Sequence, residues 1–229
     1  MVYSLISARL SRYLTQCLLC GDRAGDFGIC ASCIRDLPYL GQACESCALP
    51  LTSSARLCPS CLRQPPHCQR VQAAWQYAFP VNQLIQRFKY QRDLAAGHSL
   101  AQLAATSIAP HNEPPDLLAP IPLHWQRYWQ RGYNQAQLIA SELGKQWHLP
   151  VQARLLRKTG ATRTQSQLRR QQRLRNLLQS FALRESVEGI HIGLVDDVLT
   201  TGATLEAVAQ ILLKAGAHKV SAFVLARTP

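Results

Sequence analysis

Short apolar runs alternate with amphipathic repeats from residue 71 to the last residue of the chain. Runs of strand length, rich in β-branched or aromatic residues, predict strands over 71–79, 117–123, 190–197 and 220–225. Apolar positions three and four residues apart predict helices over 82–90, 94–108, 133–147 and 205–214. This alternation indicates an α/β domain with a mainly parallel sheet, in which 117–123 is expected to be the first strand.

The strand over 190–197 ends in two carboxylates, and a loop of small residues leads from it into the next helix. Open α/β sheets bind ligands at the carboxyl ends of their strands. The free N–H groups at a helix start can hold a phosphate, and glycine in the loop permits its close approach. Paired carboxylates suit vicinal hydroxyls, so we predict a ribose 5-phosphate site formed by Asp196, Asp197, Thr200, Thr201, Gly202, Ala203 and Thr204.

Two plainer interpretations of this segment stay open. It could be an ordinary buried strand, turn and helix, or the acidic strand end of a nucleotide triphosphatase. The sequence contains no glycine-rich Walker A loop with its lysine, which weakens the second interpretation.

Eight of the nine cysteines form four C-x-x-C pairs in the N-terminal quarter of the chain. Two such pairs complete a tetrahedral zinc site. The last two pairs repeat the first two at a shift of 27 or 28 residues, which favours one zinc ion within each repeat. We therefore expect two structural Zn²⁺ ions, bound by Cys17, Cys20, Cys30, Cys33, Cys44, Cys47, Cys58 and Cys61.

Disulfides are the alternative to zinc, but no secretion signal or stretch of about 20 apolar residues is found. We expect a cytoplasmic protein without a membrane span, in which thiols stay reduced. The predicted organisation is an N-terminal helix over 1–16, a double zinc ribbon over 17–66 and the α/β domain over 71–229.

The formal net charge is +12, and zinc-bound thiolates lower it without making the chain acidic. A basic chain favours a polyanionic ligand or a nucleic acid. Residues 154–184 contain arginines and lysine but no acid, and 157–176 is too polar for a core, so we predict a flexible basic loop there. A solvated charged face is the alternative to the nucleic-acid contacts that we assign to Arg169, Arg170, Arg173 and Arg175.

The segment 190–205 resembles the 5-phosphoribosyl-1-pyrophosphate (PRPP) motif of type I phosphoribosyltransferases. The whole chain is similar to the ComF/GntX family, bacterial proteins linked to DNA uptake or to the use of external DNA. The features that carry this resemblance are the cysteine pairs, Phe88-Lys89-Tyr90, Pro120-Ile121-Pro122, Arg131-Gly132-Tyr133-Asn134-Gln135, Thr164-Gln165 through Asn176, and Asp196 through Thr204.

The resemblance implies a type I phosphoribosyltransferase fold with helices on both faces of the sheet. The basic segment 163–176 is similar to the loop that closes over PRPP in amidophosphoribosyltransferases. Magnesium would be bound largely by PRPP itself. Pyrophosphate contacts are expected from Arg131, Asn134, Gln135, Arg163, Gln167 and Arg173, and a helix start with Asn near its cap is the alternative for the segment 131–135.

Three functions are compatible with these features. We favour a protein that supports DNA uptake or utilisation, binds PRPP or ribose 5-phosphate groups, contacts single-stranded DNA, and works beside DNA-uptake or DNA-processing proteins. The alternatives are an active phosphoribosyltransferase that releases pyrophosphate to an unknown acceptor, and a PRPP-sensing regulator without turnover, connected to gluconate utilisation in GntX-type proteins. No catalytic base is identifiable from the sequence.

Overall fold

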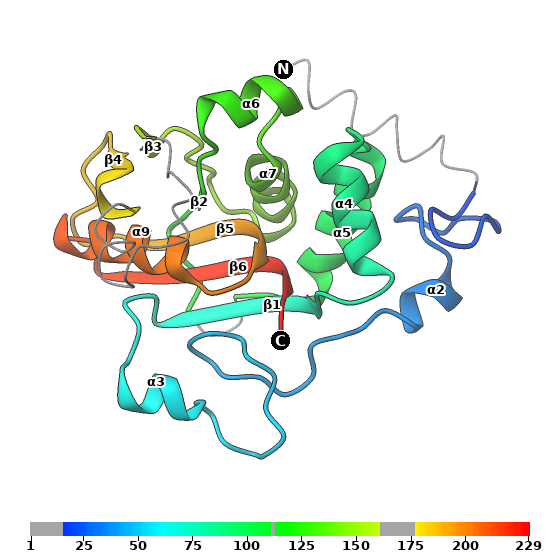
Figure 1. Ribbon diagram of the computed structural model, residues 1–229, viewed down its shortest axis with the longest axis horizontal. Helices are drawn as coiled ribbons and strands as arrows, with labels where there is room; N and C mark the ends of the chain where they lie inside the picture. Colours follow the sequence, from blue (N-terminus) through cyan, green and yellow to red (C-terminus); the bar gives the residue numbers. More distant parts are fainter. Residues whose placement is uncertain (1–15, 111–112, 161–176) are drawn as a thin grey trace, which may run out of the picture.

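The computed structural model describes residues 16–110, 113–160 and 177–229 (Figure 1). Its strands are β1 (Arg70–Gln76), β2 (Leu117–Pro120), β3 (Leu156–Lys158), β4 (Phe181–Leu183), β5 (His191–Leu199) and β6 (Lys219–Arg227). Its helices are α2 (Ala31–Arg35), α3 (Pro59–Arg63), α4 (Val81–Tyr90), α5 (Leu94–Ser107), α6 (Trp125–Arg131), α7 (Gln135–Trp147) and α9 (Ala203–Lys214).

Four strands form a parallel sheet in the order β1-β6-β5-β2. The last strand of the chain, β6, lies between β1 and β5 and is buried along almost its whole length. The expectation that 117–123 is the first strand of the sheet is wrong, because β1 precedes it and pairs in parallel with β6. The alternating aromatic residues of β1 predicted a strand but not its neighbour, because the apolar pattern of a strand does not depend on which strand it pairs with.

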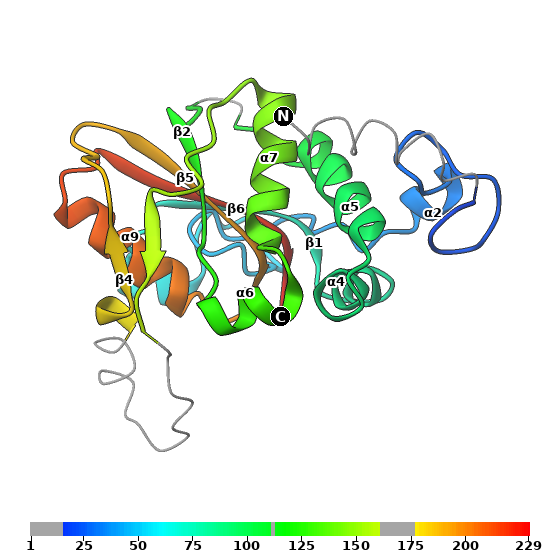
Figure 2. The same ribbon diagram turned by 90° about the horizontal axis from the view of Figure 1, so that it is seen from above.

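Helices cover both faces of the sheet, as the resemblance implied (Figures 1 and 2). On one face, α4, α5 and α7 bury their apolar sides against residues such as Phe223 and Leu225 of β6. On the other face, α9 and the β3–β4 hairpin pack against the alternate residues Ala222 and Val224. The strand period of two thus divides β6 between two hydrophobic cores.

The two cysteine repeats pack on different parts of the α/β domain. The first, which contains α2, lies beside α4 and α5, and its Cys17 and Leu37 belong to the same hydrophobic cluster as those helices (Figure 1). Arg87 of α4 also donates from Nη1 to the Leu18 carbonyl at 2.9 Å. The second repeat, which contains α3, lies below β1, and Ala48 joins the core on the α9 face.

The outer edge of β1 is covered by the chain that joins the two repeats. Leu40 N–H donates to the Ala74 carbonyl, and Gln76 N–H donates to the Pro38 carbonyl. Farther along, Val71 N–H donates to the Glu45 carbonyl at 2.8 Å. The free edge that a sheet would otherwise present is therefore paired.

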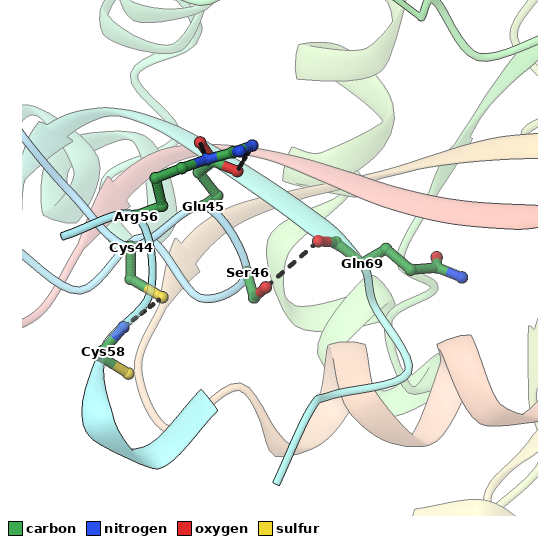
Figure 3. A network of polar contacts seen from close by, with 6 residues as sticks. All are labelled: Cys44, Glu45, Ser46, Arg56, Cys58 and Gln69. Carbon is green, nitrogen blue, oxygen red and sulfur yellow. Dashed lines mark hydrogen bonds and ion pairs between the residues drawn. The ribbon is translucent and has the colours of Figure 1, made fainter. Parts of the chain in front are cut away.

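Polar contacts anchor the second repeat beside the start of β1 (Figure 3). Arg56 forms a two-pronged ion pair with Glu45 at 2.8 and 2.9 Å. Ser46 Oγ donates to the Gln69 carbonyl at 3.4 Å, and Gln69 Oε1 accepts from Val220 N–H of β6 at 2.9 Å. Gln69 thus connects the cysteine module to the centre of the sheet.

The basic loop begins later than predicted. Arg157 and Lys158 belong to β3, which pairs antiparallel with β4, so the prediction of a loop from residue 157 is wrong at these two positions. Leu156 and Phe181 are buried and hold this hairpin against the α9 face. The remainder of the predicted loop, 161–176, and the predicted helix at 1–15 lie outside the described residues.

Candidate ribose phosphate site and metal centres

Asp196 and Asp197 lie near the C-terminal end of β5, in the interior of the sheet. Adjacent strand residues point to opposite faces, so the two carboxylates meet different surroundings. The Asp197 side chain faces the α4 side, where Lys89 Nζ lies 2.9 Å from its Oδ1 and both side chains are largely buried. Asp196 Oδ1 accepts the Asp197 backbone N–H at 2.9 Å.

Asp196 has a raised affinity for a proton. Burial, and then the negative charge of Asp197, raises the pKa of Asp196 from 3.8 to about 7, against the opposing effect of Lys89 and Lys158. Burial correspondingly lowers the pKa of Lys158. Near neutral pH a partly protonated Asp196 can donate as well as accept a hydrogen bond. The Asp196 and Asp197 carboxyl groups are therefore suited to hydrogen bonds with neutral hydroxyl groups.

The loop after β5 has the features of an anion site. Gly202 is the N-cap of α9 with φ of 75°, a left-handed conformation that glycine adopts readily. The first N–H groups of the twelve-residue α9 have no partners within the helix, and its dipole adds positive potential there. Thr200 and Thr201 are exposed, and Thr201 Oγ1 accepts the Ala203 N–H at 3.4 Å. Thr204, in the first turn, is half-buried.

Arg227, at the end of β6, holds the base of this loop. Its Nη1 donates to the carbonyls of Leu199 and Thr200 at 3.2 and 2.7 Å. Its Nε donates to the Cys47 carbonyl of the second cysteine repeat at 3.1 Å. One guanidinium therefore connects the predicted phosphate loop to the predicted metal module.

The predicted pyrophosphate residues that the structure describes lie around the start of α7. Asn134 is the N-cap of α7, since its Oδ1 accepts the Ala136 N–H at 3.1 Å, while its Nδ2 donates to the Ile121 carbonyl. Arg131 Nη1 donates to Oε1 of the buried Gln135 at 3.1 Å. Asn134 and the Gln135 Oε1 are thus engaged within the protein, the buried Gln135 Nε2 has no hydrogen-bond partner among the described residues, and Arg131 is the member of this group that reaches a cavity.

That cavity, of about 390 Å³, lies between the end of α4 and α6. It is lined by Lys89, Tyr90, Arg92, Arg127, Gln130 and Arg131. Lys89 therefore joins two features, because the same side chain lines the cavity and pairs with Asp197. The cavity is strongly cationic and adjoins the carboxylate couple.

Six predicted residues cannot be placed relative to this site. Residues 161–176 are not described, so the predictions for the following positions stay predictions: Arg163, Gln167, Arg169, Arg170, Arg173 and Arg175.

The eight paired cysteines gather into two groups of four, in the sequential arrangement predicted from the repeat. Within each group all sulfur atoms lie within 4.8 Å of one another. Cys20 and Cys30 sulfurs are 3.6 Å apart, and Cys47 and Cys58 sulfurs 3.8 Å. Zn–S bonds of about 2.3 Å in a tetrahedron require S···S distances of about 3.8 Å, so both groups fit zinc.

Backbone N–H groups reach sulfur atoms in both groups. Backbone N–H groups of Leu19 and Cys30 donate to Cys17 Sγ, and the Cys58 N–H donates to Cys44 Sγ. Although burial raises it, the pKa of Cys17 is lowered to about 6 by such N–H donors. Cys68, the ninth cysteine, is buried outside both groups, and burial raises its pKa to about 12.

The roles of Lys89 and Arg227 were not predicted from the sequence. Lys89 entered only as part of the Phe88-Lys89-Tyr90 resemblance, and Arg227 was given no role. Both side chains contact residues that are far away in the sequence, and no local sequence pattern predicts those contacts. Their contacts depend on the placement of α4 and β6 beside β5.

Two family models match separate parts of the chain. Residues 13–62 match the Double zinc ribbon domain family, and residues 130–229 match the Phosphoribosyl transferase domain family. Among the described residues, no helix combines the length and apolar character needed to cross a bilayer.

Three curated relatives align over most of both chains. The DNA utilization protein YhgH of Escherichia coli K12 is 35% identical, over 89% of this chain and 92% of the relative. Competence protein F of Haemophilus influenzae is 32% identical, over 87% and 90%. Competence protein ComFC of Bacillus subtilis is 30% identical, over 89% and 85%. With its paired four-cysteine groups and its acidic strand end before a phosphoribosyltransferase-type loop, the chain belongs to the ComF/GntX family.

Proposed function

We propose that this protein supports the utilisation or uptake of DNA by binding a ribose 5-phosphate group, carried by PRPP or by a nucleotide, together with single-stranded DNA. The observation that carries the proposal is the juxtaposition at one sheet edge of the carboxylates Asp196 and Asp197 with the loop 200–204 and the start of α9. The names of the relatives support a role in DNA utilisation or competence. Reduced zinc thiolates suit the cytoplasm, where we propose that it works.

The two halves of the site would bind different parts of the ligand. Asp196 and Asp197 would accept hydrogen bonds from the ribose hydroxyls. The N–H groups of residues 202–204 and the threonine hydroxyls would bind the 5-phosphate. Lys89 Nζ lies 2.9 Å from Oδ1 of Asp197 and pairs with this largely buried carboxylate. The pentose monophosphate is therefore the proposed minimal ligand.

The cavity beside this site offers a place for a pyrophosphate. Arg131 and Lys89 line it, and guanidinium and ammonium groups bind phosphate oxygens well. Magnesium would arrive with PRPP and be held mainly by the ligand's own oxygens.

The same cationic cavity favours an active phosphoribosyltransferase as the second candidate. In such a reaction the bond between C1 and the pyrophosphate oxygen breaks, an acceptor forms a new bond to C1, and pyrophosphate leaves with the electron pair. Cations at the leaving group stabilise its developing charge. Release of pyrophosphate in the presence of an acceptor panel tests this candidate.

The central experiment is titration calorimetry of the zinc-loaded protein with ribose 5-phosphate, with PRPP and Mg²⁺, and with a single-stranded oligonucleotide. We expect Asp196→Asn combined with Asp197→Asn to abolish binding of both sugar phosphates. Glu188→Gln, an exposed change beyond the opposite end of β5, is the matched control and should bind as the wild type does. Unchanged affinity in the double variant would overturn the proposed site.

The three ligands separate the candidate functions. Binding of PRPP without DNA binding or turnover would indicate a PRPP-sensing regulator. Binding of DNA and of sugar phosphates without pyrophosphate release would support the favoured function. The DNA-uptake or DNA-processing proteins proposed as partners require capture from cells that carry the intact protein.

A further inference from the structure

The helix α6 turns its aromatic residues away from the protein. None of its residues is buried. Trp125, Tyr128 and Trp129 are spaced i, i+3 and i+4, so they share one face of the helix. The exposed fractions are 62% for Trp125, 48% for Tyr128, 79% for Trp129 and 72% for Tyr90, at the end of the adjacent α4. An amphipathic helix normally buries such a face, so this one is available to a ligand.

The other side of α6 is cationic. Arg127 and Arg131 line the cavity of about 390 Å³, opposite Arg92. Arg92 Nη2 donates to the Gln130 carbonyl at 3.0 Å, which holds the two walls together. In the part of the chain that the structure describes, Arg92 and Arg127 form no ion pair with a carboxylate.

One cation–aromatic contact joins the cationic side of α6 to the end of α4. The Arg131 guanidinium lies over the Tyr90 ring, 5.3 Å from its centroid. This arrangement leaves a ring edge and a positive charge side by side on the surface. Proteins that bind single strands without sequence preference combine two kinds of group. Aromatic side chains stack on the bases, and nearby cations neutralise the phosphates.

The shape of the surface distinguishes a single strand from other polyanions. A DNA duplex hides the faces of its bases, so rings that protrude from a helix have nothing to stack on. A membrane surface also attracts aromatic and basic groups, and the vesicle measurement described below distinguishes it from a strand. Four cations of this surface line the cavity between α4 and α6.

We propose that Tyr90, Trp125, Tyr128 and Trp129 form a stacking platform for the bases of a single-stranded nucleic acid, whose phosphates enter the cavity between α4 and α6. This inference rests on the proposed function. It gives the single-stranded nucleic acid a binding site among the described residues. Lys89 joins the cavity to Asp197 at 2.9 Å. A strand on the platform therefore brings its terminal nucleotide toward the ribose phosphate site.

Fluorescence anisotropy with a labelled oligothymidine strand tests the platform on the zinc-loaded protein. We expect Trp125→Ala, Tyr128→Ala and Trp129→Ala together to weaken binding at least tenfold, because one stacked base contributes roughly 5- to 150-fold by alanine substitution. Trp129→Phe keeps a ring and should bind nearly as well as the wild type. Since these side chains are exposed, circular dichroism and zinc content should be unchanged.

The cations have their own variant and control. Arg127→Gln should weaken binding and reduce the salt slope of the affinity by about 0.7, the value for one lost phosphate contact on a single strand. Lys214→Gln removes an equal charge from the far end of α9 and should leave both quantities almost unchanged. The protein's own fluorescence gives a second signal, because Trp75 is buried and Trp125 and Trp129 are exposed to quenching by stacked bases.

The outcomes separate the platform from the proposed function. Wild-type affinity for DNA in the triple aromatic variant would overturn the platform and leave the proposed function standing. A wild-type protein that binds PRPP but no single strand would overturn both the platform and the DNA part of the proposed function. Anionic vesicles that bind the wild type but not the triple variant, while DNA affinity is equal in both, would assign the surface to a membrane.

Discussion

Asp196 and Asp197 are neighbours in sequence with different chemistry. Asp197 is buried and has a lysine partner, whereas Asp196 is half-buried beside a like charge, and its pKa is raised to about 7. The sequence alone predicted both as ribose ligands but could not distinguish them. The difference depends on Lys89, which α4 brings to β5, and on the depth at which each strand face is buried.

The raised pKa of Asp196 predicts a fall in stability as pH rises. Its folded-state pKa of about 7 exceeds the value of 3.8 outside the fold, so its contribution is fully present below 3.8 and is lost as pH rises through 7. We expect the wild type to lose roughly 1–3 kcal/mol relative to Asp196→Asn between pH 5.5 and 8, since one pKa unit is about 1.4 kcal/mol. Denaturant unfolding of both proteins across this range measures the difference, and parallel pH curves would contradict it.

The Lys89–Asp197 pair predicts a strong coupling between two distant residues. Lys89→Met leaves a largely buried carboxylate without its partner and should lower the unfolding free energy by about 2 kcal/mol. Adding Asp197→Asn should recover part of this loss, because the unpaired charge disappears. A double-mutant cycle by urea denaturation gives the coupling energy, and strictly additive effects would show that the pair does not act as a unit.

At the scale of elements, local periodicity predicted most of the fold. The long helices and the strands of the sheet appeared close to their predicted bounds, because each has a clear apolar face. Helix α6 was not predicted. Its aromatic residues face solvent, and none of its residues is buried, so it lacks the apolar core-facing side that marks the other helices. The β3–β4 hairpin was missed because two three-residue strands are too short to show a period.

Gly202 predicts a local effect on phosphate binding. A Cβ at this position would meet only Leu199 Cδ1, at 3.6 Å, so Gly202→Ala costs mainly the left-handed backbone conformation, about 1 kcal/mol. We expect the affinity for ribose 5-phosphate to fall about fivefold in calorimetry, because the loop relaxes away from its φ of 75° and binding must restore that conformation at a cost of about 1 kcal/mol. Gly189→Ala, with φ of 73° and open space around it, carries the same strain elsewhere and should keep wild-type affinity.

At the scale of the whole molecule, the cysteine repeats and the α/β domain share their cores. The sequence predicted two modules joined by a linker, with boundaries at 66 and 71. The zinc pairing could be predicted because it follows from spacing. The packing of Leu37, Leu40 and Ala48 into the two sheet cores could not, since isolated apolar residues between cysteines carry no period.

Loss of zinc is therefore expected to weaken the sheet as well as the ribbons. Cys58→Ser should reduce bound zinc from two ions to one and lower the midpoint of thermal unfolding of the whole chain. Cys68→Ser, at the buried cysteine outside both groups, should keep two zinc ions. Zinc content by mass spectrometry with calorimetric unfolding measures both, and an unchanged sheet transition in Cys58→Ser would indicate independent modules.

The position of β6 sets an order on folding during synthesis. β1 is made early, yet its partner within the sheet is residues 219–227, which follow all the other described strands in the chain. Until then β1 and β5 lack the strand that joins them in the sheet, and the ribbon segment 38–45, which hydrogen-bonds to the outer edge of β1, is the described segment that can shield β1 from neighbouring chains. A cell short of zinc would thus produce nascent chains prone to aggregate before the ligand site exists.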